Sequence, residues 1–145
     1  MPRNRVIDLF IFDVNQTMFS LSEIESRFIE SNLNANLVDK WFISILKEGF
    51  ANSQDGRFID FFTIAKYELE KIFLNFKKNE YKKDIDFILN GFKKLTIHNN
   101  VKKSLKLIYE KNYKIVTLTN GSKKITESML KYNNCEKYID RCFSI

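Results

Sequence analysis

The spacing of apolar side chains along the chain predicts two kinds of segment: short, mostly apolar runs and longer stretches with helical periodicity. One apolar run covers residues 6–12 and ends at Asp13, and another covers residues 114–118 and leads into a polar loop. Runs of this length are too short for a helix with a polar face and are typical of strands buried on both faces of a parallel sheet. We therefore expect strands 6–12 and 114–118 to be parallel neighbours, with Asp13 and Thr119 at the same end.

Residues 20–94, between these two strands, follow a helical period over most of their length. The apolar residues that recur at helical spacing predict four helices, and Asp60 is suited to cap the N-terminus of the third. Large apolar residues at helical spacing usually form a packed core and not a cofactor pocket. We expect a helical subdomain that acts as a lid over Asp13, because a lid excludes water from a site at a strand end. The predicted core side chains are Ile24, Phe28, Ile29, Leu37, Trp41, Phe42, Ile45, Leu46, Phe61, Phe62, Ala65, Leu69, Ile72, Phe73, Phe76, Ile85, Ile88, Leu89, Phe92 and Leu95.

After residue 94 the pattern alternates between helix and strand again. It predicts amphipathic helices at 99–111 and 122–132, and a third strand that begins near Tyr138. This order of elements predicts an α/β fold with a partial, Rossmann-like parallel sheet of about three strands. The core would comprise residues 1–19 and 95–145, with the helical cap inserted after the first strand.

Asp13 is the first candidate for chemistry. A carboxylate is already ionised at pH 7, so it can attack a saturated carbon or a phosphorus atom without a general base. Thr17 and the backbone N–H groups of the turn could then hold the anionic end of a substrate. A structural alternative is equally open at this point, because an apolar run that ends in Asp is common and Asp13 could simply cap the turn.

The polar loop Thr119-Asn120-Gly121-Ser122 is the second candidate, because it joins a strand to the N-terminus of a helix. Free N–H groups and the helix dipole point at such a loop, which favours an anion there. Taken alone, the loop could be an ordinary turn. Its pairing with the turn after Asp13 favours a functional site.

Three stretches resemble the haloacid dehalogenase superfamily, and within it the type II haloacid dehalogenase-like branch. They are Phe-Asp-Val-Asn-Gln-Thr-Met-Phe-Ser-Leu at 12–21, Leu-Thr-Asn-Gly-Ser at 118–122 and Leu-Thr-Ile-His-Asn-Asn-Val at 95–101. The resemblance implies a hydrolase in which Asp13 displaces halide from a small 2-halo acid through an ester intermediate. It also implies a helical cap after the first motif and no metal or other cofactor. The substrate-binding residues that it implies are Asn15, Thr17, Thr119 and Asn120.

The sequence also departs from the pattern of this family. The family's third motif supplies a lysine beside the nucleophile, and its fourth supplies acidic or polar residues that position water or a metal. Neither motif is present, so the chain resembles a truncated member with impaired activity. Asn15 stands where the family's phosphatases carry a second Asp, and Asn cannot transfer a proton in that role. Dehalogenases usually carry an aromatic residue there. Their first cap arginine falls near Trp41, where this chain has none; Arg27 and Arg57 are its only cap arginines.

Two alternatives to a dehalogenase remain open. One is a phosphatase-like enzyme in which Asp13 attacks phosphorus beside Mg²⁺. The other is a non-catalytic remnant or interaction domain, in which the exposed flank of the first strand would bind another strand. Lys123 and Lys124 are the nearest residues by sequence that could replace the missing lysine. His98, in a loop, is not expected to take a direct part.

The net charge of +6 is unevenly distributed. Residues 1–75 carry eight Lys or Arg and eleven Asp or Glu, a balance of −3, whereas residues 76–145 carry sixteen and seven, a balance of +9. No nucleic-acid module accompanies these charges, so we expect solvated helix faces and no nucleic-acid partner. A positive field would still attract a small anionic substrate. Many of the lysines form pairs, which are Lys77-Lys78, Lys82-Lys83, Lys93-Lys94, Lys102-Lys103 and Lys123-Lys124.

Cys135 and Cys142 show neither metal-ligand spacing nor a CxxC motif. We expect reduced thiols in a cytoplasmic protein. The first apolar run is interrupted by Asp8 and Asp13, which does not fit a signal peptide, and no run approaches the roughly 20 apolar residues of a membrane span. The sequence therefore predicts no membrane partner, and it leaves a homodimer open.

Overall fold

The computed structural model describes residues 7–76 and 80–145. Val6, expected in the first strand, and the pair Lys77-Lys78, expected on a helix face, lie outside the described residues. The chain divides into two compact units. The core unit comprises residues 1–20 and 96–145, and the helical unit comprises residues 21–95.

The core unit is built on a parallel sheet of three strands, β1 (Leu9–Phe12), β2 (Lys114–Thr119) and β3 (Arg141–Ser144), in the order β1-β2-β3. Leu9 lies opposite Lys114 and Phe12 lies opposite Thr117 in the β1–β2 pair. β3 pairs with the other side of β2. The predicted α/β fold with a parallel three-stranded sheet is confirmed. So is the expectation that the polar ends of β1 and β2 lie at the same edge.

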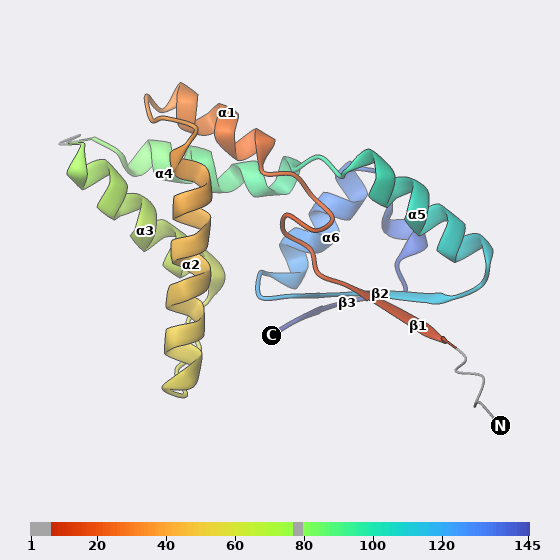
Figure 1. The fold of residues 1–145 in the computed structure, drawn as a ribbon. Helices are drawn as coiled ribbons and strands as arrows, with labels where there is room; N and C mark the ends of the chain where they lie inside the picture. The colour runs from red at the N-terminus through yellow and green to blue at the C-terminus, as the bar shows by residue number, and fades with distance from the viewer. Residues whose placement is uncertain (1–6, 77–79) are drawn as a thin grey trace. The chain divides into compact units, whose positions relative to one another are not determined.

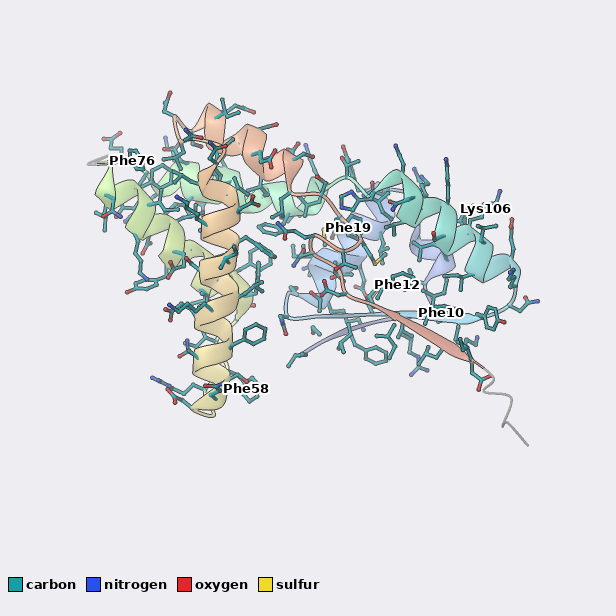
Figure 2. All side chains as sticks on the ribbon, in the orientation of Figure 1. Phe10, Phe12, Phe19, Phe58, Phe76 and Lys106 are labelled. Carbon is teal, nitrogen blue, oxygen red and sulfur yellow. The ribbon has the colours of Figure 1, made fainter. Side chains whose placement is uncertain are left out.

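Helices α5 (Asn99–Glu110) and α6 (Lys123–Tyr132) cover one face of this sheet (Figure 1). A short 3-10 helix, η2 (Glu136–Tyr138), leads from α6 into β3. Leu105 of α5 and Met129 and Leu130 of α6 are buried, as their amphipathic spacing predicts. On β1, the side chains of Phe10 and Phe12, labelled in Figure 2, are half-buried.

The prediction that the first strand is buried on both faces is wrong. Leu9 is 46% exposed and Ile11 is 60% exposed, although both lie within β1. Successive side chains of a strand point to opposite faces of a sheet. Since α5 and α6 cover one face only, the residues that alternate with Phe10 and Phe12 lie on a face that no helix of the core unit covers within the described residues.

The helical unit contains α1 (Ser22–Glu30), α2 (Leu37–Gln54), α3 (Phe61–Asn75), α4 (Lys82–Asn90) and the 3-10 helix η1 (Gly91–Lys94). Its core is rich in aromatic side chains, and the Trp41 ring contacts those of Phe28 and Phe92. The Trp41 Nε1–H donates to the Ala65 carbonyl oxygen (3.0 Å) and so joins α2 to α3. Asp60 accepts from the Thr63 N–H (3.1 Å), which is the predicted N-cap of α3.

Two of the predicted core residues in this unit are exposed. Ile29 and Phe76, at the ends of α1 and α3, are each 61% exposed. The apolar stripe of a helix commonly runs past the turns that contact a neighbour, so terminal members of a stripe lose their burial. Helix α2 continues through Gly49, since a single glycine in a helix interior costs only about 1 kcal/mol relative to alanine. Within the described residues, no helix is both long and apolar enough to cross a membrane.

Candidate functional site

Asp13 directly follows β1, and its side chain is exposed at the carboxyl edge of the sheet. The turn after it alternates between exposed polar residues and buried apolar ones. Val14, Met18 and Phe19 are completely buried, whereas Asp13 and Thr17 remain exposed. The apolar residues therefore anchor the turn in the core unit and leave its polar side chains at the surface.

Backbone hydrogen bonds fix the shape of this turn. The Met18 N–H donates to the Val14 carbonyl (2.9 Å), and the Gln16 N–H donates to the Phe19 carbonyl (2.9 Å). Gln16 has a φ of 62°, in the left-handed region that is uncommon for a non-glycine residue. The His98 N–H donates to the Met18 carbonyl (3.0 Å), so His98 supports the turn through its backbone.

Thr17 orients the Asp13 carboxylate. Its Oγ1–H donates to Asp13 Oδ2 at 2.8 Å. A hydroxyl that donates to an ionised carboxylate makes a charge-assisted hydrogen bond, which is stronger than one between neutral groups. The hydrogen bond holds the carboxylate in one rotamer and engages one of its two oxygens.

The loop after β2 is fixed by Thr119, whose side chain is buried. Thr119 Oγ1 accepts from the Gly121 N–H (3.0 Å), and the Thr119 carbonyl accepts from the Ile145 N–H (3.0 Å). Helix α6 starts immediately after this loop, and the side chain of Ser122 makes no capping hydrogen bond there. The first N–H groups of α6 thus face the loop, where they favour negative charge.

The two loops approach each other at Gly121. A Cβ atom at Gly121 would lie 3.3 Å from Thr119 Oγ1 and 3.5 Å from Asn15 Nδ2. The Asn15 Oδ1 atom is buried and has no hydrogen-bond partner among the described residues. The structure thus brings Asn15, Thr119 and Gly121 together and joins Thr17 to Asp13, while Asn120 is exposed within the second loop.

The positions of Gly121, Gln16 and the His98 backbone were not identified as parts of the site from the sequence. The signal for Gly121 was present, since it lies within the Thr-Asn-Gly-Ser loop whose small residues permit close approach. No signal was available for Gln16, because the left-handed region is favoured by Gly, Asn and Asp. The His98 contribution is made by its main chain, so the identity of the side chain carried no information.

The arginines and lysines named in the sequence analysis either form interactions with other residues or are exposed. Arg27 is buried, its Nε–H donates to Glu23 Oε1 (2.8 Å), and its guanidinium lies over the Phe87 ring. Arg57 pairs with Asp55 (2.7 Å). Lys123 and Lys124 are exposed, and Lys123 lies 3.8 Å from Glu127 along α6. Within residues 7–76 and 80–145, no lysine or arginine forms an ion pair with Asp13.

The potential metal-binding side chains of the described residues are not grouped into a recognisable site. In the described part of the chain, no group of three or more His, Cys, Asp or Glu side chains is placed to hold an ion. Cys135 and Cys142 are free cysteines, and burial raises the pKa of both thiols above the usual value. A raised pKa keeps them protonated and weakly nucleophilic at pH 7.

Comparison with known proteins finds no matching family model and no matching curated protein. Solved structures do match. The L-2-haloacid dehalogenase from Xanthobacter autotrophicus superposes with a TM-score of 0.86 at 15% identity, over 97% of this chain and 57% of that one. A defluorinating L-2-haloacid dehalogenase superposes with a TM-score of 0.79 at 16% identity, over 97% of this chain and 61% of that one. The HAD-hydrolase YfnB from Bacillus subtilis, bound to magnesium, superposes with a TM-score of 0.69 at 11% identity, over 97% of this chain and 64% of that one.

These superpositions define the class of fold. The chain has the α/β fold of the matching part of the L-2-haloacid dehalogenases. The resemblance that the sequence motifs indicated is confirmed at the level of the fold. The chain spans 57% and 61% of the length of the two dehalogenases compared.

Proposed function

We propose that Asp13 is the nucleophile of a haloacid dehalogenase type of hydrolase, acting on a small 2-halo acid. The observation that carries the proposal is the exposed Asp13 carboxylate at the carboxyl edge of β1, held by Thr17 at 2.8 Å, on a fold similar to that of L-2-haloacid dehalogenases. One structure of the Xanthobacter enzyme has chloropropionic acid covalently bound. A carboxylate that forms an ester accounts for a covalent adduct of this kind.

The proposed reaction has two steps. In the first, Asp13 Oδ1 bonds to C2 of the halo acid, and the carbon–halogen bond breaks as halide leaves with its electron pair. In the second, water attacks the carboxyl carbon of Asp13 and the bond between that carbon and the ester oxygen breaks. The 2-hydroxy acid leaves, the Asp13 carboxylate is restored, and the proton of the water passes to solvent or a base. Neither step requires a metal.

The other loop residues would bind the substrate. Because Thr17 already donates to Asp13 Oδ2, its role would be to direct Oδ1 at the substrate carbon. Asn15, Thr119 and Asn120, with the N-terminus of α6, would hold the substrate carboxylate or the departing halide, since amide and hydroxyl donors stabilise negative charge. The role of the helical unit as a lid stays a prediction.

We expect the 145-residue chain to form the ester but to turn over slowly. No cation pairs with Asp13 in the described residues, and residues 1–145 contain no match to the motif that the resemblance implies for positioning water. Removal of one group that stabilises developing charge typically costs on the order of 10²–10³ in rate. Turnover of 2-chloropropionate should therefore be close to zero, whereas a single adduct per chain should accumulate.

The test is intact-mass spectrometry after incubation with L-2-chloropropionate, with peptide mapping and a parallel measurement of released chloride. The proposal predicts a mass gain of one propionate unit on the peptide that contains Asp13, with about one chloride released per chain. Asp13→Asn should show neither signal. Asp8→Asn, which changes the exposed carboxylate at the other end of β1, is the matched control and should form the adduct normally.

Three outcomes would alter this view. If no adduct forms, the chain is not this type of enzyme, and the non-catalytic alternative is favoured. If the chain turns over many substrate molecules in an Asp13-dependent way, the expected impairment is wrong, and Lys123 or Lys124 becomes a candidate for the missing lysine. If p-nitrophenyl phosphate is hydrolysed only with added Mg²⁺, the phosphatase alternative is favoured, although the described residues offer no ligand cluster for the ion.

A further inference from the structure

The turn after Asp13 is joined to a second segment of the core unit by a short antiparallel ladder. Residues 18–20 pair there with residues 96–98, and Phe19, labelled in Figure 2, lies opposite Ile97. Backbone hydrogen bonds of 2.9 Å and 3.0 Å between the two segments flank this pair. In an antiparallel ladder, hydrogen-bonded and non-hydrogen-bonded pairs alternate. The backbone groups of Phe19 and Ile97 therefore point away from each other, toward other parts of the core unit.

The outward-facing groups of Phe19 close the turn itself. Its carbonyl accepts from the Gln16 N–H (2.9 Å), and its N–H donates to the Val14 carbonyl (3.2 Å). On the other side of the ladder, the outward-facing N–H of Ile97 donates to Asn133 Oδ1 (2.9 Å). Ile97 is buried, and a buried N–H that loses its acceptor is costly. The position of Ile97, and with it the ladder, therefore depends on Asn133.

The side chain of Asn133 is itself held in one orientation. Its Nδ2–H donates to the Met129 carbonyl (2.8 Å), and its backbone carbonyl accepts from Lys102 Nζ (2.8 Å) and from the buried Cys135 thiol (3.4 Å). An amide nitrogen donates and an amide oxygen accepts. The reversed orientation would place two donors together at Ile97 and two acceptors together at Met129. Asn133 is thus fixed with Oδ1 toward the N–H of Ile97.

Helix α6 consequently contributes to both loops of the candidate site. Its first N–H groups face the loop at residues 119–122, whereas Asn133, its C-cap residue, holds Ile97. The helix has ten residues and is about 15 Å long. Loops that bear functional groups are commonly positioned by a stiffer element of this kind. The turn after Asp13 and the second loop are therefore both anchored to one helix.

We propose that Asn133 is a positioning residue for the Asp13 carboxylate and that it acts through Ile97 and Phe19. The inference rests on the proposed function, in which Asp13 attacks the substrate. Loss of Asn133 slows the attack, because a small displacement of the turn misdirects Asp13 Oδ1. Substrate affinity changes much less, because the loop at residues 119–122 keeps its own hydrogen bonds.

The experiment follows adduct formation by variants of the complete 145-residue chain at several concentrations of L-2-chloropropionate. Asn133→Ala removes the acceptor and should lower the rate at saturation by about tenfold, with the half-saturating concentration within about twofold of the original. Asn133→Asp keeps an oxygen that accepts from Ile97 and should recover most of the rate, although it loses the donor to Met129. Asn133→Ser, whose hydroxyl is too short to reach Ile97, replaces the Ala variant if circular dichroism shows that variant to be unfolded.

Asn90→Ala is the matched control. Asn90 is the last residue of α4, and its Nδ2–H donates to the Asp86 carbonyl four residues earlier (2.9 Å), as Asn133 donates to Met129. Its Oδ1 accepts from Lys93 Nζ (3.0 Å), within the helical unit. The control therefore loses the same contact at a helix end in the other unit, and it should react at the original rate.

Amide hydrogen exchange tests the same inference without a reaction. In Asn133→Ala, the N–H groups of Gln16 and Met18 should exchange at least about tenfold faster than in the original chain, whereas those of β2, which report global unfolding, should be unchanged. Unchanged exchange at Gln16 and Met18 would overturn the inference. So would an Asp variant that reacts as slowly as the Ala variant, or a control that slows equally. If the original chain forms no adduct, the proposed nucleophile is wrong, and exchange alone then decides whether Asn133 holds the turn.

Discussion

At the scale of single residues, the site depends on how closely two loops approach. Gly121 lies against Thr119 and Asn15, and the buried Asn15 Oδ1 has no partner within the described residues. A buried acceptor without a partner costs free energy in the absence of ligand. A substrate hydroxyl, water or N–H group that reached Asn15 would recover that cost. We therefore expect the absence of a side chain at Gly121 to matter for the geometry of the candidate site.

We predict that Gly121→Ala slows adduct formation on Asp13 by about tenfold, with a change in unfolding free energy below about 1 kcal/mol. The added methyl group would lie 3.3 Å from Thr119 Oγ1 and so displace the loop by a few tenths of an ångström. Small misplacements of this kind reduce reaction rates much more than stability. The measurements are the rate of mass gain with L-2-chloropropionate and thermal unfolding.

Gly49→Ala is the control for this experiment. It lies within α2, where an added methyl would meet Ile64 at an ordinary contact distance of 3.8 Å. Ala should stabilise that helix by up to about 1 kcal/mol and leave the rate unchanged. Equal rates for Gly121→Ala and the original chain would show that the approach of the two loops does not control reactivity.

At the scale of elements, the sheet is held by a carboxylate between β2 and β3. Asp140 Oδ2 accepts from the Ile115 N–H (2.9 Å), and Asp140 Oδ1 accepts from Lys114 Nζ (2.9 Å). The Asp140 N–H in turn donates to the Ile115 carbonyl (2.8 Å). The hydrogen bond from the Ile115 N–H, and then the one from Lys114, lower the pKa of Asp140 below its usual value. This contact fixes where β3 begins to pair with β2.

We predict that Asp140→Ala lowers the free energy of unfolding at pH 7 by roughly 1 kcal/mol, because the Ile115 N–H loses its acceptor. The pKa of Asp140 is lower in the folded state than in the unfolded state. Its stabilising contribution is therefore complete above the ordinary carboxyl pKa and disappears as the pH falls through the folded-state value. Urea unfolding from pH 7 to pH 2 should show the two proteins converging at the acidic end.

Glu110→Gln provides a comparison on the surface of α5. Glu110 and Lys106 are both exposed and 3.7 Å apart, so this ion pair should contribute little. The prediction is contradicted if Asp140→Ala and the original chain still differ in free energy of unfolding at pH 2 as much as at pH 7. The ionised carboxylate would then not be the stabilising group.

At the scale of the whole molecule, the helical unit has a core of its own. Trp41, Phe73 and Leu69 are buried within residues 21–95, and aromatic contacts join its helices. The unit begins at Leu21 and ends at Leu95, and both residues are buried. Just outside it, the Ser20 N–H donates to the Thr96 carbonyl oxygen (2.9 Å), so the two ends of the unit lie close together. An insertion whose ends meet disturbs its host little, because its loop is already closed.

We predict that a fragment of residues 21–95 folds by itself, with helical circular dichroism and a cooperative thermal transition. Trp41→Ala should remove the transition, since deletion of a buried Trp costs about 3–5 kcal/mol. Leu74→Ala, at a leucine that is 60% exposed, should leave it nearly unchanged. A fragment that lacks cooperative unfolding would show that the helical unit depends on the core unit for its stability.

Much of the fold could be predicted from local patterns. The apolar runs and the polar loops after them identified β1, β2 and the edge at which Asp13 and Thr119 lie, because strand direction and chain order limit where polar ends can meet. Helical periodicity identified the helices of both units. The hydrogen bond from Thr17 to Asp13 was not predicted, because the sequence suggested that Thr17 would hold the substrate.

Long-range packing decided the rest. The composition of β1 indicated burial on both faces, but its actual exposure depends on whether another segment lies over Leu9 and Ile11, which no local pattern records. Similarly, only the tertiary structure placed Asn15 beside Gly121 and engaged Arg27 with Glu23 and Phe87. The sequence by itself determined which segments form strands and helices and where the candidate nucleophile lies, because these follow from periodicity and chain direction. The tertiary structure decided which faces are covered and which loops meet, because both depend on contacts between residues far apart in the chain.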